Sequence, residues 1–201
     1  MLKKPWNRTG DSFATPRHEE TQMTEDEEDE RWIAKHRRLG KIMIDQTHRA
    51  FADVEQGTVA DPEDIFEWTT AELMSTRPEG GVNTRWQDIP DADIVLHDHI
   101  FSILDAAAFR YFVPAYMAWA CRDLGESRST SLEFLLYHLK LPSEVGARPW
   151  KLEKWSFLSP AQCSAICAFL RFIRLVYAGD DAEKALQSYW AQFCEVGAHV
   201  E

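Results

Sequence analysis

The sequence predicts an all-α fold, a compact bundle of about six helices with at most minor β content. Apolar residues recur with the 3.6-residue period of a helix over most of the chain. Helix-start signals stand before three of these periodic segments. Strand-like patterns are confined to two short runs, at 94–97 and 155–158. Together these observations favour a fold without a sheet.

The first 30 residues differ in composition from the rest of the chain. They contain nine acidic and four basic residues and end in the acidic run TEDEEDE. Such a segment has too little apolar surface to build a core, which is typical of disorder. We therefore predict a disordered acidic N-terminal tail over 1–30, one helical domain over 31–196 and a flexible C-terminus over 197–201.

The domain is expected to open with a helix over 31–54. The acidic run just before it is favourable there, because the helix macrodipole stabilises negative charge at an N-terminus. A short second helix is predicted to begin at Asp61, followed by a loop over 75–84 that is rich in Gly, Pro and Asn. Trp86 is expected to anchor the far end of this loop in the core.

The segment 101–124 predicts a central helix that is buried nearly all round, because apolar residues cover both of its faces. Asp105 is placed to cap its N-terminus. Pro114 cannot donate a backbone hydrogen bond and is predicted to kink this helix. Alternatively, Val113 ends one helix and Pro114 opens the next.

Three further helices have capping signals at their starts. Each signal pairs a short polar residue with a Glu or Gln three positions later. The pairs are Thr130 with Glu133, Ser159 with Gln162, and Asp180 with Glu183.

Three blocks of residues resemble one protein family. The first is the central-helix pattern FxxLDxxxFRYFxPAYM, the second is the helix start LSPxQ with a later FLR, and the third is ALxxYW near the C-terminus. The matching residues are Phe101, Leu104, Asp105, Phe109, Arg110, Tyr111, Phe112, Pro114, Ala115, Tyr116, Met117, Leu158, Ser159, Pro160, Gln162, Phe169, Leu170, Arg171, Ala185, Leu186, Tyr189 and Trp190.

Over residues 45–192 the chain is similar to a family of uncharacterised bacterial domains. The resemblance implies a small, soluble, mainly helical bacterial protein of unknown function. It implies no catalytic residues.

Asp93, His97 and His99 are the candidate metal ligands. On a helix Asp93 and His97 would share one face, whereas His99 would point elsewhere. No third ligand follows at a useful spacing, and neither zinc-finger nor HExxH spacing occurs. We therefore predict hydrated side chains at this position and no metal or other cofactor.

The four cysteines are Cys121, Cys163, Cys167 and Cys194. Cys163 and Cys167 lie four residues apart on the apolar side of a predicted helix, so two thiols could chelate zinc if His138 came near. Core packing is the favoured interpretation, because cysteine is among the most buried residue types. The segments show no close-set disulfide framework, and we predict four free thiols in a reducing cytoplasm.

Arg110 and Tyr111 are a further candidate, either for a structural ion pair or for a ligand site. A charged guanidinium on a nearly all-apolar helix needs a carboxylate, a carbonyl or the solvent. The favoured interpretation is an ion pair that fixes the helix against a neighbour. The alternative is a grip for an anionic ligand in a pocket.

The net charge of −11 repels phosphate backbones and argues against nucleic-acid binding. No apolar run is long enough for a membrane span. No GxSxG, P-loop or GxGxxG motif is present, which favours a non-catalytic protein. We predict a cytoplasmic protein-binding domain, an adaptor or a toxin-neutralising protein, whose acidic surface suits a basic protein partner. The alternative is a small metal- or thiol-dependent hydrolase that uses His97, His99 or Cys121, with Cys121, His138 and an Asp converging in space.

Overall fold

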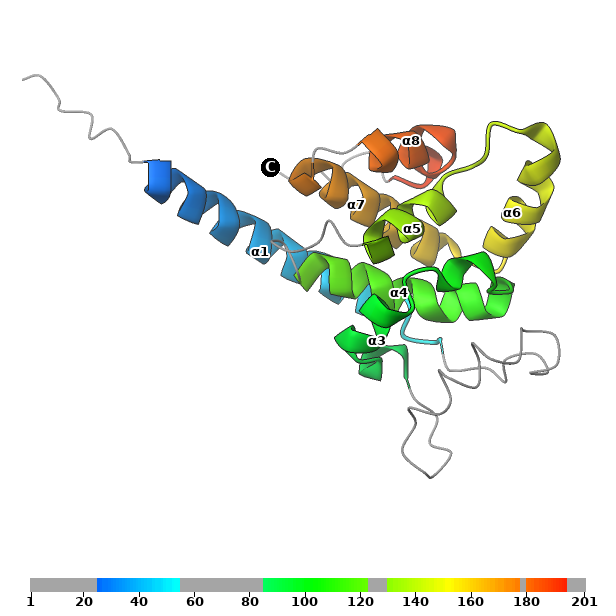
Figure 1. Cartoon of the computed structure of the whole chain (residues 1–201), viewed down its shortest axis with the longest axis horizontal. Coiled ribbons are helices and arrows are strands. Elements are labelled where there is room, and N and C mark those ends of the chain that lie inside the picture. Colours follow the sequence, from blue (N-terminus) through cyan, green and yellow to red (C-terminus); the bar gives the residue numbers. More distant parts are fainter. Residues whose placement is uncertain (1–24, 55–84, 123–129, 178–179, 195–201) are drawn as a thin grey trace, which may run out of the picture.

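The computed structural model describes residues 25–54, 85–122, 130–177 and 180–194 (Figure 1). Within these ranges the chain forms α-helices and short 3-10 helices and no strand, so the predicted all-α class is confirmed. The elements are α1 (Glu25–Ala50), η1 (Trp86–Asp88), α3 (Asp91–Leu96), η2 (Ile100–Ser102), α4 (Ala106–Arg122), α5 (Thr130–Leu139), η3 (Val145–Ala147), α6 (Arg148–Trp155), α7 (Pro160–Tyr177), α8 (Asp180–Ser188) and η4 (Trp190–Phe193).

Helix α4 is the centre of the core. It packs against α1, α3, α5 and α6, while α7 packs against α1 and α8 (Figure 1). Side chains on all sides of α4 are buried, among them Phe109, Val113, Met117 and Trp119. The prediction that this helix is buried nearly all round is confirmed.

Local signals set the starts of two helices as predicted. The Asp105 carboxylate accepts a hydrogen bond from the Ala108 amide at 2.7 Å and caps α4. At the start of α7, the Ser159 amide donates to Gln162 Oε1 at 3.0 Å and the Gln162 amide donates to Ser159 Oγ at 3.3 Å. These two bonds form a capping box.

Helix α4 continues through Pro114 as one element, so the alternative in which Val113 ends a helix is wrong. Helix α1 begins at Glu25, six residues before the predicted start at Arg31. The acidic run at 25–30 is therefore helical rather than part of a disordered tail. Its charges are compatible with a helix because they lie at the positive end of the macrodipole.

The two strand-like runs are not strands. Residues 94–97 lie in α3 and its C-terminal cap, and the run 155–158 begins at the last residue of α6 and continues into the turn that follows. Trp86 is buried as predicted, and its Nε1 donates to the Phe51 carbonyl at 3.1 Å. The expected helix from Asp61, the loop over 75–84 and the disorder of residues 1–24 lie outside the described residues.

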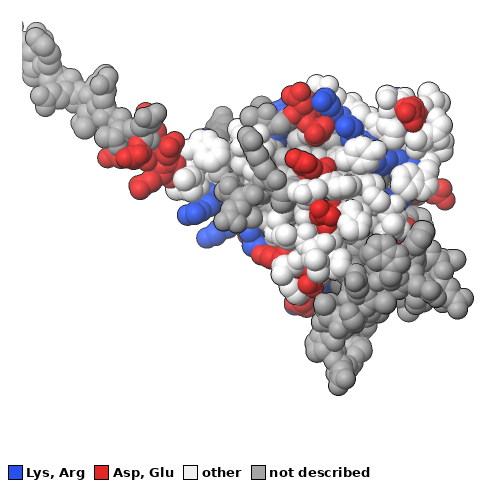
Figure 2. Space-filling model, viewed as in Figure 1, with Lys and Arg blue, Asp and Glu red and all other residues white. Residues whose placement is uncertain are grey.

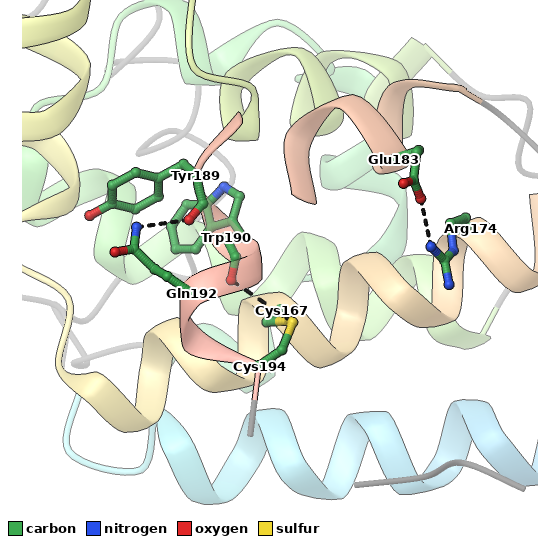
Figure 3. The surroundings of a disulfide bond; sticks show 7 residues. All are labelled: Cys167, Arg174, Glu183, Tyr189, Trp190, Gln192 and Cys194. Atoms are coloured by element: carbon green, nitrogen blue, oxygen red, sulfur yellow. Dashed lines mark hydrogen bonds and ion pairs between the residues drawn. A yellow bond between two sulfur atoms is a disulfide. The ribbon is translucent and has the colours of Figure 1, made fainter. Parts of the chain in front are cut away.

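The prediction of four free thiols is wrong for two of them. Cys167 of α7 and Cys194, just after η4, form a disulfide with their Cα atoms 5.6 Å apart (Figure 3). The pairing arises because η4 folds back onto α7, a contact between residues 27 positions apart that helical spacing does not reveal. Cys121 and Cys163 are free and buried, as core packing requires.

Gly40 sets how closely α1 can approach α4. A Cβ atom on this residue would lie far inside van der Waals contact with the backbone carbonyl oxygen of Cys121. A backbone atom in a packed helix cannot move aside as a flexible side chain can. The absence of a side chain at Gly40 is therefore a condition of the α1–α4 packing.

We predict that Gly40→Ala lowers the free energy of unfolding by about 2 kcal/mol, as is usual for overpacking in a core. Helix propensity alone predicts the opposite sign, a gain of about 1 kcal/mol. Gly146→Ala is the matched control, because a Cβ there meets no atom within 4 Å. Equilibrium urea unfolding of the three proteins measures both changes. A Gly40→Ala protein as stable as the parent would show that the two helices have room between them.

Candidate functional site

In the part of the chain that the structure describes, the candidate metal ligands Asp93, His97 and His99 do not form a metal site. Asp93 and His97 lie on successive turns at the end of α3, where the Asp93 carbonyl accepts the His97 amide at 2.9 Å. His97 is buried, whereas His99 is half exposed and its Nδ1 lies 2.9 Å from Asp98 Oδ1. Within the described ranges, no group of three or more His, Cys, Asp or Glu side chains is arranged to hold a metal ion.

Cys121 has the environment of a packing residue rather than of a nucleophile. Its side chain is buried near the end of α4, and burial raises the pKa of its thiol. A reactive cysteine needs a lowered pKa and access to its substrate. The thiol-dependent hydrolase therefore receives no support from the geometry at this residue.

Arg110 belongs to a polar network that joins three helices. Its Nη2 donates to Asp53 Oδ2 at 2.7 Å, just after the end of α1, and its Nε donates to Gln162 Oε1 at 3.1 Å, at the start of α7. Gln162 is fully buried, and its Nε2 donates to Asp53 Oδ1 at 3.4 Å. Tyr111, the next residue of α4, is buried, with its ring edge-on to Phe112.

This network has the geometry of the ion pair that the sequence analysis favours. The guanidinium already holds a carboxylate, that of Asp53, from the same chain. Its second hydrogen bond goes to the residue that also caps α7. The contacts of Arg110 therefore connect α1, α4 and α7.

Sequence reasoning missed a second polar cluster, formed by Lys151 and Lys154 of α6 and His138 of α5. Their relative exposures are only 3%, 4% and 5%. Lysine is almost never buried to this extent without a partner. A signal was present in the sequence: the two lysines stand at positions i and i+3, and the buried Trp155 at i+4, of one helical face of α6.

The cluster contains more hydrogen-bond donors than partners. Lys151 Nζ donates to the Tyr137 carbonyl at 3.2 Å, and the Ser102 hydroxyl lies 3.4 Å from His138 Nε2. Lys154 Nζ and His138 Nδ1 are buried and have no hydrogen-bond partner among the residues that the structure describes. An unpartnered buried polar group costs about 1–3 kcal/mol, so this arrangement needs an explanation.

Burial lowers the pKa of all three groups, and neighbouring lysine charges lower those of Lys151 and His138 further. Burial, followed by the charges of Lys154 and Lys140, lowers the pKa of Lys151 to about 8. Burial also lowers the pKa of Lys154 to about 8, with Asp105 acting in the opposite direction. For His138, burial and the two lysine charges lower the pKa to about 3, so the imidazole is neutral near pH 7.

A separate groove lies between α1 and α7. It has a volume of about 260 Å³, and its lining includes Ile42 and Met43 from α1 and Phe172 and Leu175 from α7. Arg171 and Arg174 also line the groove.

None of the helices in the described ranges is, on its own, both long and apolar enough to cross a membrane. One bent pair, Val145–Trp155 with Pro160–Tyr177, meets the length and composition criteria when taken together, at an angle of 117°.

Residues 41–194 match a family of unknown function, DUF6714, and the chain therefore belongs to this family. The matched span includes α4, the Arg110 network and the lysine cluster, and it begins after the acidic start of α1. No curated protein matches the chain, and no solved structure does.

We predict that the protein becomes more stable as the pH rises from about 8 to 9, below the range in which the buried thiols of Cys121 and Cys163, whose pKa is raised by burial, oppose the change. In this window the unfolded chain, whose lysines titrate near 10.5, binds more protons than the folded chain, whose Lys151 and Lys154 titrate near 8. Stability then rises with pH by up to about 1.4 kcal/mol per unit for each lysine. Urea unfolding at a series of pH values measures the slope.

The variant Lys154→Met is expected to lose about half of this slope, because one shifted amine is removed. Lys184→Met is the control, since Lys184 is exposed and pairs with Asp180 on the surface. If the free energy of unfolding changes with pH equally in Lys154→Met and Lys184→Met, the pH dependence does not arise from the lysines of α6.

A double-mutant cycle of Arg110→Met and Asp53→Asn is expected to give a coupling energy of about 1 kcal/mol, because the pair is only partly buried. Arg110→Met alone should lower the free energy of unfolding more than Arg122→Met, whose exposed side chain pairs with Asp91. Urea unfolding of the parent, the single variants and the double variant gives the free energies of unfolding from which the coupling energy is calculated. Zero coupling would show that the Arg110–Asp53 pair does not connect α1 to α4.

Proposed function

Within this family of unknown function, we propose that the chain is a non-catalytic protein-binding domain, such as an adaptor or a toxin-neutralising protein, whose partner is basic. The docking surface is the start of α1. The observation that carries this proposal is the exposed acidic run 26–30, which stands on a helix that projects past the packed helices (Figures 1 and 2). The run places five carboxylates within less than two helical turns.

Apolar side chains adjoin this acidic run. Trp32 and Ile33 are 43% and 39% exposed. Trp32 lies on the stripe of α1 that continues through His36 to Met43, where it is buried against the core. An apolar stripe that extends past its packing partners is typical of a surface that receives another protein.

The remainder of α1 holds this surface in place. From His36 onward the helix is packed against α4 and α7, and it is continuous with the acidic run. A docking element that is already helical loses little conformational entropy when a partner binds. The start of α1 is therefore preorganised for association.

The order of charges along α1 suits a directional contact. Acidic side chains come first, and basic side chains follow from Arg31 to Lys41, as Figure 2 shows for the projecting helix. A basic segment of a partner is attracted to the first part and repelled by the second. Such complementarity raises the association rate and fixes the orientation of the partner.

We also propose a bacterial origin, on the resemblance of the sequence, and a cytoplasmic location. The Cys167–Cys194 disulfide provides the test of the location, because a reducing cytoplasm keeps most thiols free. If the protein is cytoplasmic, these two cysteines are reduced in the cell and the bond forms after lysis, so acid quenching of intact cells followed by alkylation in denaturant should label both. A bond that is already formed at lysis would contradict a cytoplasmic location.

We predict that an amphipathic peptide of Lys and Leu binds the protein through α1. The test variant is Glu28→Gln/Asp29→Asn/Glu30→Gln, which should weaken binding about tenfold because it removes three attractive charges. The control, Glu133→Gln/Glu144→Gln/Glu153→Gln, removes the same charge from other exposed sites and should change the Kd less than about twofold. Fluorescence anisotropy of the labelled peptide measures each Kd.

The variant Trp32→Ser separates a docking surface from simple charge attraction. It leaves the charge unchanged and is expected to weaken binding of the amphipathic peptide by about tenfold, as for an aromatic anchor. A scrambled peptide of the same composition should bind more weakly than the amphipathic one. Equal binding of both peptides, or equal losses in the test and control triple variants, would reject α1 as the docking surface.

A further inference from the structure

The lysine cluster of α6 plays no part in the protein-binding proposal and lies on other elements. We propose that Lys151, Lys154 and His138 form a binding site for a small oxyanion that presents a carboxylate or phosphate group. The site is assembled from α5, α6 and η2 and lies beside the start of α4.

The cluster has more hydrogen-bond donors than acceptors, which favours a ligand that supplies acceptors. An ammonium group has three donors and no acceptor. Lys154 Nζ uses none of its donors, and Lys151 Nζ uses one, on the Tyr137 carbonyl. The indole Nε1 of Trp155, which follows Lys154 in α6, is a further buried donor without a partner. An oxyanion offers several acceptor positions to such a group of donors.

The tautomer of His138 adds one more donor. We assign the Ser102 hydroxyl as the donor to His138 Nε2, across 3.4 Å. Because the imidazole is neutral, its single proton then lies on Nδ1. This nitrogen is buried and has no partner, so it too can donate to a bound anion.

The charges around Lys151 and Lys154 also favour a bound anion. Within the described ranges, no carboxylate lies within ion-pair distance of Lys151 or Lys154. Asp105 affects the titration of Lys154, but its Oδ1 is engaged at the start of α4. Two neighbouring buried cations repel each other, and a bound anion offsets both this repulsion and their loss of hydration.

Aromatic rings lie close to both ammonium groups. Lys154 Nζ lies 4.3 Å from the centre of the Trp150 ring and 6.0 Å from that of Phe109, and Lys151 Nζ lies 5.2 Å from that of Tyr137. These cation–π contacts limit the positions of the donors before a ligand arrives. Trp150 and Tyr137 are themselves exposed, so the site adjoins solvent.

Isothermal titration with inorganic phosphate and, separately, with acetate tests the proposal on the full chain, with chloride at equal ionic strength as the control. We expect saturable binding of at least one oxyanion to the parent protein and none of chloride. Binding of phosphate alone identifies a phosphate site, and binding of acetate identifies a site for carboxylates. Lys154→Met and Lys151→Met should each weaken binding at least tenfold, whereas Lys184→Met should leave the Kd unchanged.

Circular dichroism establishes that each variant is folded, and Lys154→Arg provides a second variant that keeps the charge and should retain part of the binding. A further readout is the pH profile, measured with whichever anion binds, because affinity should fall above about pH 8 as the two lysines lose their protons. The groups that face these lysines are His138 and Lys140 from α5 and Asp105 from the start of α4. Absence of binding by both oxyanions, or an unchanged Kd in folded Lys154→Met, would overturn the proposal.

Discussion

The fold depends on the burial of α4 on nearly every side. A helix with apolar side chains all round has no face that it can present to water, so other helices must cover it. Four helices do so, and the close approach of α1 requires a residue without a side chain at Gly40. The position of α1 in turn fixes α7, which packs along it, and α8, which packs on α7. The burial of one helix thus determines where most of the others lie.

Two polar clusters border this core, and they differ in how well their hydrogen bonds are satisfied. Around Arg110 the guanidinium, the carboxylate of Asp53 and the amide of Gln162 bond to one another, which is the pattern of a structural network. Around Lys154 the donors are buried and several lack an acceptor. A network in which every donor and acceptor is hydrogen-bonded has a structural role. Buried donors without acceptors indicate that a binding partner is missing. This difference is the reason for assigning a structural role to the first and ligand binding to the second.

The sequence predicted features that depend on neighbouring residues. The capping box of Ser159 and Gln162, the cap at Asp105 and the burial of α4 follow from local patterns, and all three are present. The disulfide was missed because Cys194 meets Cys167 only after η4 folds back onto α7. The partner of Arg110 could not be named for the same reason, since Asp53 is 57 residues away. The lysine cluster was missed because no helix was predicted over 148–155, so Lys151 and Lys154 were not placed on one face with Trp155.

The disulfide has a consequence for the denatured chain. It joins Cys167 of α7 to Cys194 across 27 residues, so that α8, η4 and the part of α7 from Cys167 onward belong to one covalently closed ring. Heat or urea can disrupt the packing of this ring but cannot separate its ends, and the entropy that closure removes from the denatured ensemble corresponds to about 3.5 kcal/mol in the chain-entropy description. Trp190 and Tyr189, which lie within the ring beside Trp155, therefore stay close to α7 after the core has opened. When the protein refolds with this bond intact, the contact between Cys167 and Cys194 is therefore already in place.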